Sequence, residues 1–344
     1  MTVRWNGRGL VRVGLLLVLG PCAASALIEH VLELRDAARL TANDTFYAVG
    51  KRRIRYHRTG PSAPGPTVVL LNGMMASLEQ WDAVQTALST VGPVVSYDRG
   101  GNGFSDSADA HGANADADEL NHLLHAPDIT GPFVLVSFSS SSMLAIVFAN
   151  GHPDIVKGLV FIDPTVRAGS KTYRRIYWRP AVINPLEAFF GYTRLKLAIE
   201  TRNAPPPSAA LERSNAVVVS TRHWLASSED VMSLDESAAE AVAALATHPF
   251  ADLPLGVLTT ANPAESEYLR VYFERHKELA SSSDRGILRA VHGDHSQLLD
   301  DRIMVGSIVD LIRTITDEAR ARGLEGTDAP VATNGNPDPV GPTK

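Results

Sequence analysis

The sequence predicts an α/β fold in which helices cover both faces of a mostly parallel central sheet. Between about residues 40 and 319, apolar runs of strand length alternate with helical patterns, which is typical of a doubly wound sheet. One of these runs, at residues 67–71, is apolar throughout, as expected of a strand that is buried on both faces. The chain has 344 residues, of which 44% are hydrophobic and 20% charged, and this length allows a large core.

The individual elements are expected in a regular order along the chain. Strands are predicted at residues 54–57, 67–71, 94–97, 133–136, 159–162, 255–258 and 287–291. Helices are predicted at residues 78–88, 115–124, 140–150, 264–279 and 302–315. Right-handed crossovers between parallel strands would place these helices on both faces of the sheet.

Residues 165–252 interrupt this alternation, because they contain no clear pair of strands. The segment is rich in aromatic residues, and residues 236–245 are rich in alanine, the strongest helix former. We interpret it as a helical cap inserted over the strand ends, with a second independent domain as the alternative. The remaining parts, residues 40–164 and 253–319, would form the core.

The N-terminus has the plan of an export signal or a membrane anchor. Arg4, Arg8 and Arg12 precede residues 13–28, a run without a charged side chain. As a helix this run would span ~24 Å, which is shorter than a bilayer core of ~30 Å. Residues 1–39 are therefore expected to be a signal or anchor with a linker, and a buried core helix is the alternative. Arginines on this side would leave the rest of the chain outside the cytoplasm.

Composition excludes several classes of protein. The net charge of −6 excludes a generally basic nucleic-acid binder. A single cysteine, Cys22, excludes an intramolecular disulfide and a multi-cysteine metal site. No motif suggests a cofactor or a metal. Residues 320–344 are rich in Gly, Pro, Asp and Asn and are expected to form a disordered tail.

The strand predicted at 133–136 leads directly into a helix through a run of serines. In this run Ser139 is flanked, two residues away on each side, by Ser137 and Ser141. A nucleophile elbow needs a sharp turn with small residues at these two places, where glycine is usual. Ser139 would be the nucleophile, and the Ser140 amide would point at a developing oxyanion. A serine-rich loop that caps a helix is the alternative.

Two more loops follow predicted strands. Asn72-Gly73 follows the strand at 67–71, and the Met74 amide is a candidate second donor to an oxyanion. The loop at residues 98–106 contains three glycines, and its Asp98 and Arg99 are expected to brace loops rather than react.

The Asn72-Gly73 turn, the loop at 98–106 and the turn at Ser139 resemble the α/β-hydrolase superfamily in order and spacing, over about residues 45–317. The resemblance implies the α/β-hydrolase fold with a helical cap, and a serine hydrolase similar to exported or membrane-anchored bacterial members. The chain departs from the pattern at Asn72, where most members have histidine, and at the two flanking serines.

The order nucleophile, acid, histidine in this superfamily implies the other catalytic residues. His295 follows the last predicted strand and is the candidate base, with His292 as the alternative. The loop after residues 255–258 lacks an aspartate. Asp163, at the end of the preceding strand, is therefore the candidate acid, and Glu265 is the alternative acid.

The resulting hypothesis is hydrolysis of a carboxylic ester or related acyl bond through an acyl-enzyme on Ser139. The aromatic cap favours a small apolar ester-like substrate. One alternative is an aminopeptidase, whose cap would supply an acid such as Glu187, Glu200 or Glu212. The other is an inactive binding protein with the same fold.

Overall fold

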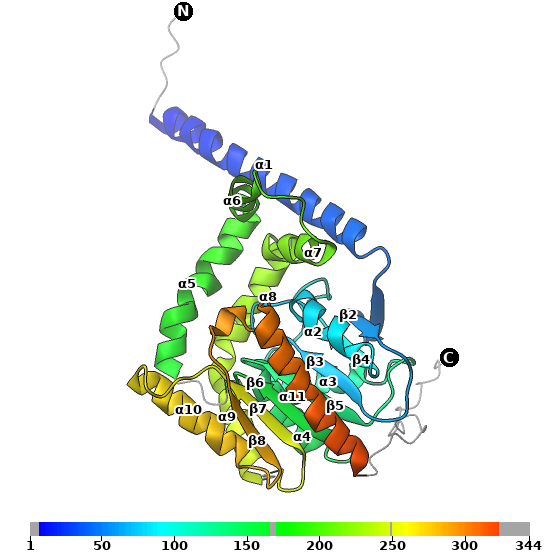
Figure 1. The fold of residues 1–344 in the computed structure, drawn as a ribbon. Coiled ribbons are helices and arrows are strands. Elements are labelled where there is room, and N and C mark those ends of the chain that lie inside the picture. The colour runs from blue at the N-terminus through cyan, green and yellow to red at the C-terminus, as the bar shows by residue number, and fades with distance from the viewer. Residues whose placement is uncertain (1–6, 166–169, 248–249, 323–344) are drawn as a thin grey trace, which may run out of the picture.

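A single sheet of eight strands forms the centre of the molecule (Figure 1). The computed structural model describes residues 7–165, 170–247 and 250–322. The strand order is β1-β2-β4-β3-β5-β6-β7-β8, with β3 to β8 parallel and β1 and β2 antiparallel at one edge. The strands are β1 (Thr45–Val49), β2 (Arg52–Thr59), β3 (Thr67–Leu71), β4 (Val94–Tyr97), β5 (Phe133–Phe138), β6 (Val156–Ile162), β7 (Leu255–Thr259) and β8 (Gly286–Ala290).

Helices cover both faces of this sheet, so the predicted fold class is confirmed. Alternate residues of β3 enter different clusters, with Val68 and Leu70 on one face and Val69 and Leu71 on the other. The helices of the core are η1 (Leu78–Trp81), α2 (Asp82–Leu88), α3 (Ala113–Leu123), α4 (Ser141–Gly151), α10 (Glu267–Ala280), η2 (His295–Gln297) and α11 (Arg302–Ala321). The first face packs against α2 and α11, and the second against α3 and α4.

The carboxyl ends of β3 to β8 lie at one edge of the sheet, because these strands are parallel. Loops that carry the predicted functional residues all leave the sheet at this edge. In open α/β sheets, this edge is where ligands bind. The fold therefore brings together residues that are more than 200 positions apart in the chain, from Met74 to His295.

Five helices lie between β6 and β7, in the segment expected to be a cap. They are α5 (Ser170–Phe189), α6 (Tyr192–Thr201), α7 (Ala209–Val218), α8 (Thr221–Met232) and α9 (Leu234–Thr247). The alanines of α9 pack against α3 and α4 and join the main core cluster, so this helix lies on the helical layer that covers one face of the sheet. Small side chains allow this close helix packing, which explains the alanine-rich run.

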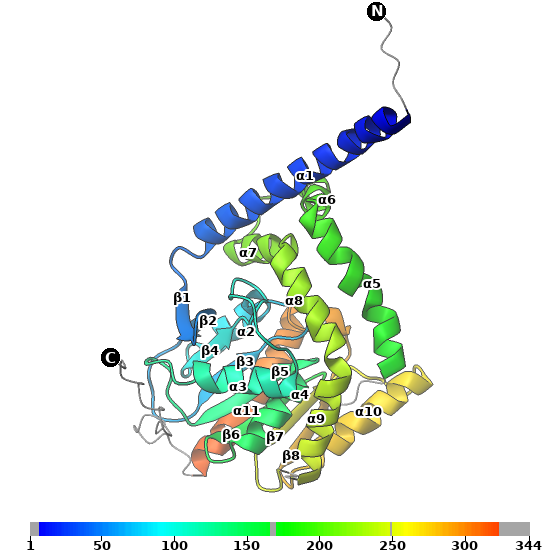
Figure 2. The ribbon, with the colours of Figure 1, turned by 180° about the vertical axis from the view of Figure 1, so that it is seen from behind.

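The N-terminal helix α1 (Gly7–Leu40) extends past the uncharged run and lies across the cap (Figure 2). It contacts α5 and α7, and its N-terminal half projects beyond the body of the protein. Across the described ranges, no helix combines the length and apolar character needed to cross a membrane. The expectation of a signal or anchor stays a prediction. Helix α11 runs into the expected tail as far as Ala321, and residues 323–344 lie outside the described part.

Candidate active site

Ser139 lies at the sharp turn between β5 and α4 and has a left-handed backbone, with φ of 56°. Such a φ is strained for a residue with a Cβ and persists only where neighbouring structure holds it. Here the Ser139 amide donates to the carbonyl of Ile162 (3.0 Å), and its carbonyl accepts from the Thr165 amide (2.9 Å). The turn is thus fixed to the end of β6 by both backbone groups of the serine.

The two serines in the glycine positions of the turn are both buried and hydrogen-bonded. The Ser141 hydroxyl accepts from the Phe138 amide (3.0 Å) and lies 2.9 Å from the carbonyl of Leu71, to which it can donate. The Ser137 hydroxyl lies 3.3 Å from that of Ser142. The Ser141 hydroxyl thus joins the turn to β3, and the Ser137 hydroxyl joins β5 to α4, so the departure from glycine adds contacts to the elbow without opening it.

His295 connects Ser139 to Asp163. Its Nε2 lies 3.1 Å from the Ser139 Oγ, and its Nδ1 lies 2.5 Å from Asp163 Oδ2. The ring of Phe138 stacks on the imidazole with 4.8 Å between ring centroids. The imidazole is 46% exposed, whereas the side chain of Asp163 is 8% exposed. The buried carboxylate can therefore orient a base that solvent and substrate can reach.

The environment of Asp163 favours its ionised form. Burial raises the pKa of Asp163, but the hydrogen bond and positive charge of His295 and the amide of Thr260 outweigh burial and hold this pKa below its ordinary value. Thr260 donates twice, from its amide to Oδ1 (2.9 Å) and from its hydroxyl to Oδ2 (2.9 Å). Like Ser139, Asp163 has a left-handed backbone, with φ of 43°.

A buried histidine, His276 on α10, contacts the chain next to Asp163. Its Nε2 lies 2.8 Å from the carbonyl of Pro164, which can only accept, so Nε2 carries the proton. Its Nδ1 then accepts from the Thr259 hydroxyl (2.7 Å). Burial lowers the pKa of His276, which agrees with a neutral ring. Because the ring joins α10, β7 and the residue after Asp163, it fixes the position of the carboxylate.

The two alternatives from the sequence lie elsewhere. Glu265 is exposed, and its carboxylate accepts from the Asn262 side chain (3.0 Å). His292 is also exposed. Within the described ranges, neither is hydrogen-bonded to Ser139 or His295. The structure thus brings together Ser139, His295 and Asp163, and it does not bring Glu265 or His292 to them.

The two predicted oxyanion donors are the amides of Met74, in the loop after β3, and of Ser140, directly before α4. Both residues also line a small cavity of about 20 Å³, together with Arg99 and Asp230. In the described part of the chain, neither amide is hydrogen-bonded to a protein acceptor. Unpaired amides beside a helix N-terminus are suited to binding a negatively charged oxygen.

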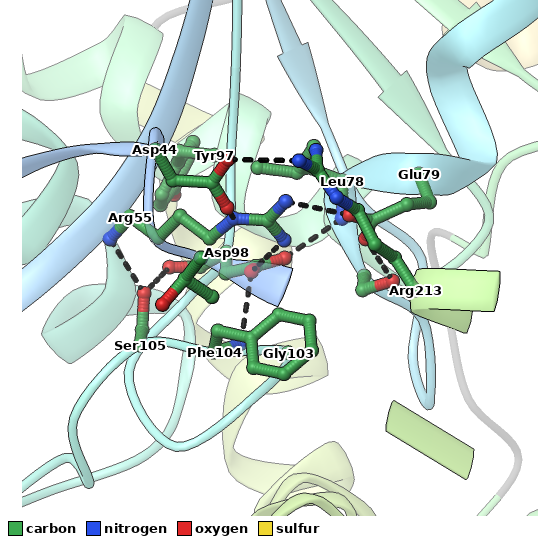
Figure 3. Close-up of polar contacts among 12 residues, drawn as sticks. Asp44, Arg55, Leu78, Glu79, Tyr97, Asp98, Gly103, Phe104, Ser105 and Arg213 are labelled. Atoms are coloured by element: carbon green, nitrogen blue, oxygen red, sulfur yellow. Dashed lines mark hydrogen bonds and ion pairs between the residues drawn. The ribbon is translucent and has the colours of Figure 1, made fainter. Parts of the chain in front are cut away.

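A buried ionic network holds the loop that carries Met74, and sequence reasoning missed it (Figure 3). Arg55 on β2 is bonded to Asp44 (2.6 Å), Glu79 (2.6 Å) and Asp98 (3.1 Å). Asp98 in turn accepts from the amide of Leu78 (2.7 Å). Burial raises the pKa of Asp98 to about 6, although the charge of Arg55 opposes this. The signal in the sequence was an arginine between apolar residues in a predicted strand.

Arg99 joins the core to the cap. It donates to Asp230 on α8 (2.8 Å) and to Asp116 on α3 (3.4 Å). Asp98 and Arg99 thus both brace loops, as the sequence analysis expected. Within the described residues, no group of three or more His, Cys, Asp or Glu side chains could hold a metal ion.

Replacing Thr260 by valine should lower the reactivity of Ser139 towards an activated ester by about 10-fold, because one charge-assisted hydrogen bond to Asp163 is lost. The Thr260 amide and the overall fold should be unaffected. Initial rates with a p-nitrophenyl ester would measure the change. Thr260→Ser restores the hydroxyl and should restore the rate, and equal rates for the valine and serine variants would contradict this role.

Comparison with known proteins gives a consistent result. A profile described as "Alpha/beta hydrolase family" matches residues 68–303. An uncharacterized protein of Bacillus subtilis, YqjL, is 31% identical over 111 residues, which are 32% of this chain and 43% of that protein. The match therefore spans less than half the length of this relative.

Several solved structures share the fold. An enol-lactonase from Burkholderia xenovorans LB400 has a TM-score of 0.57 and 18% identity, covering 78% of this chain and 100% of its own. A thermophilic esterase from Thermogutta terrifontis has a TM-score of 0.56 and 19% identity, covering 80% and 99%. A loop variant of a haloalkane dehalogenase from Bradyrhizobium elkanii has a TM-score of 0.58 and 18% identity, covering 81% and 99%. At these identities the likeness concerns the fold alone.

Proposed function

Because the chain belongs to the alpha/beta hydrolase family, we propose that it is a serine hydrolase that cleaves a carboxylic ester or a related acyl bond. One observation carries this proposal above the others. A continuous line of hydrogen bonds runs from the carboxylate of Asp163 through His295 to the Ser139 hydroxyl. This arrangement is the one that activates a serine, whose hydroxyl is a poor nucleophile by itself at neutral pH.

In the proposed reaction, Nε2 of His295 takes the proton of Ser139 as its oxygen attacks the carbonyl carbon of the ester. The imidazolium that forms is stabilised by Asp163, which accepts from Nδ1 and fixes the tautomer. His295 then gives its proton to the leaving alcohol, and the acyl group stays on Ser139. A water molecule attacks this acyl-enzyme with His295 again as the base, which releases the acid and restores the serine.

The tetrahedral intermediate carries a negative oxygen that the enzyme must stabilise. The amides of Met74 and Ser140 are the proposed donors, and one such donor commonly contributes ~3 kcal/mol. The surrounding structure supports both, because Ser140 directly precedes α4 and the ionic network of Arg55 anchors the loop after β3. Both donors would therefore be in place before the substrate arrives.

An apolar substrate is supported by the cap. Trp178 and Leu186 are large apolar side chains that are exposed on α5. The acids considered for an aminopeptidase give that alternative no support, since Glu187 lies 3.9 Å from Lys196 and Glu212 is paired with Arg39. An uncharged ester therefore remains the better supported substrate class.

A fluorophosphonate probe tests this proposal. It reacts with activated serines, so the wild-type protein should be labelled at Ser139, as read by mass spectrometry of the labelled peptide. Ser139→Ala should remain unlabelled. Absence of labelling in the folded wild-type protein would favour the inactive binding protein instead.

A further inference from the structure

The carboxylates of α1 all face the body of the protein. Glu29 and Asp36 are bonded to Arg194 of α6 at 2.7–2.9 Å. Glu33 accepts from both the amide and the hydroxyl of Thr221 at the start of α8 (2.7 Å each). These three acids follow at spacings of four and three residues, so they lie on one face of the helix.

The opposite face of α1 is apolar and exposed. Leu27, Val31 and Leu34 are likewise separated by four and then three residues, so they share one face of the helix. Their side chains are 65%, 55% and 58% exposed, respectively. A helix on the surface of a globular protein normally turns its apolar face inward and its charges outward. This helix does the reverse, so its outer face is suited to an apolar environment.

The junction of α5 and α6 packs against the inner face of α1, the face that carries the acids. Ser25 donates to the carbonyl of Phe190 (2.8 Å), and Gly191 packs against Glu29, so this junction lies directly beside the middle of α1. Figures 1 and 2 show α6 beneath α1 at the end of the molecule that carries the N-terminus. We call the outer face of α1, above this junction, the α1–α6 surface, and its exposed apolar members are Leu27, Val31 and Leu34.

Positive charge lies next to this surface. Arg35 is exposed and is one turn from Val31 on the outer face of α1. In the sequence, Arg8 and Arg12 precede the run of residues 13–28 that has no charged side chain. A basic residue beside an apolar helix face fits the interface of a bilayer with anionic headgroups.

From this arrangement we propose that the α1–α6 surface binds the interface of a phospholipid bilayer that contains anionic lipid. The acids of α1 stay bonded to the cap, while Leu27, Val31 and Leu34 enter the region between headgroups and acyl chains. The cap is thereby held against the membrane. This binding does not depend on the hydrolysis proposed above.

Sedimentation with vesicles tests the proposal with the full chain. Vesicles of phosphatidylcholine with about one quarter phosphatidylglycerol should bind the wild-type protein, and added salt or pure phosphatidylcholine should weaken binding. The triple variant L27Q/V31Q/L34Q should lower the partition coefficient about 10-fold or more, because three apolar contacts are lost. Circular dichroism should show an unchanged fold, since all three side chains are exposed.

A control variant separates the α1–α6 surface from other exposed apolar side chains. The triple variant V91Q/V271Q/I303Q changes three other exposed apolar side chains, outside the α1–α6 surface, and should bind vesicles like the wild type. Ser139→Ala should also bind normally, which separates this proposal from the proposed reaction. If the wild-type protein does not bind vesicles, the proposal is wrong. If the wild-type protein instead forms dimers that L27Q/V31Q/L34Q disrupts, this face of α1 binds a second copy of the chain.

Discussion

Replacing Ser139 by alanine should lower kcat for a short p-nitrophenyl ester by about 10⁴-fold or more, to a level close to background. The reason is that no other group in the site can form the acyl-enzyme, so only the proposed oxyanion donors and substrate binding would remain. The hydrogen bonds that fix the turn use the backbone of residue 139, and these survive the substitution. Initial rates at saturating substrate, with an unchanged urea midpoint, would measure the effect.

Ser307→Ala is a matched control for this experiment. Ser307 lies on α11, and its hydroxyl donates to the carbonyl of Ile303 within the same helix (3.2 Å). The same atom is removed from the same residue type, so kcat should stay at the wild-type level. Substantial esterase activity in Ser139→Ala, above that of denatured protein, would show that another group carries the reaction.

Asp163→Asn should lower kcat by about 10⁴-fold while the protein stays folded. An amide in place of the carboxylate cannot stabilise the imidazolium with a negative charge. Both oxygens of Asp163 accept from Thr260, so the amide nitrogen of asparagine would face a donor wherever it points. Asparagine would then turn His295 into the wrong tautomer or displace it. Initial rates and urea unfolding of the same preparation would separate catalysis from stability.

Glu265→Gln is the matched control, because it makes the same chemical change at the other acid that the sequence offered. Glu265 is exposed and not bonded to His295, so the activity should remain. The opposite pattern, with full activity in Asp163→Asn and none in Glu265→Gln, would show that Glu265, after β7, is the catalytic acid and that Asp163, after β6, is not.

The same carboxylate contributes to the stability of the fold in a defined pH range. The pKa of Asp163 is lowered in the folded protein, so its contribution is complete above the ordinary pKa of an aspartate and is lost as the pH falls through the lower folded value. Between pH 5 and 8, Asp163 therefore stays ionised. It does not by itself impose a pH dependence on either stability or activity in that range.

Sequence reasoning succeeded where the local pattern decides the structure. The run at β3 is buried on both faces, and a strand followed at once by serines and a helix predicted the turn at Ser139. Edge strand β1 was missed because it is partly exposed and its pattern shows no clear alternation. The position of α9 was also missed, since its alanines identify a helix but not the surface against which it packs.

Contacts between residues that are far apart in the chain could not be predicted from the sequence. Arg55 and the three acids around it come from separate segments, and only the sheet order brings them together. Likewise, Thr260, directly after β7, bonds to Asp163, and His276 on α10 bonds to Pro164. No spacing in the sequence predicts these contacts. The acid itself could be proposed from the end of a strand, but choosing it over Glu265 needed the geometry.

The placement of the acids on α1 bears on proteolytic processing. The small residues Ala24-Ser25-Ala26, which resemble a peptidase site, precede every acidic residue of the helix. A cut there would detach the apolar leader and still leave Glu29, Glu33 and Asp36 clamped to Arg194 and Thr221. The rest of α1 would still hold the cap, so a cut before Leu27 and the integrity of the cap are separable in this architecture.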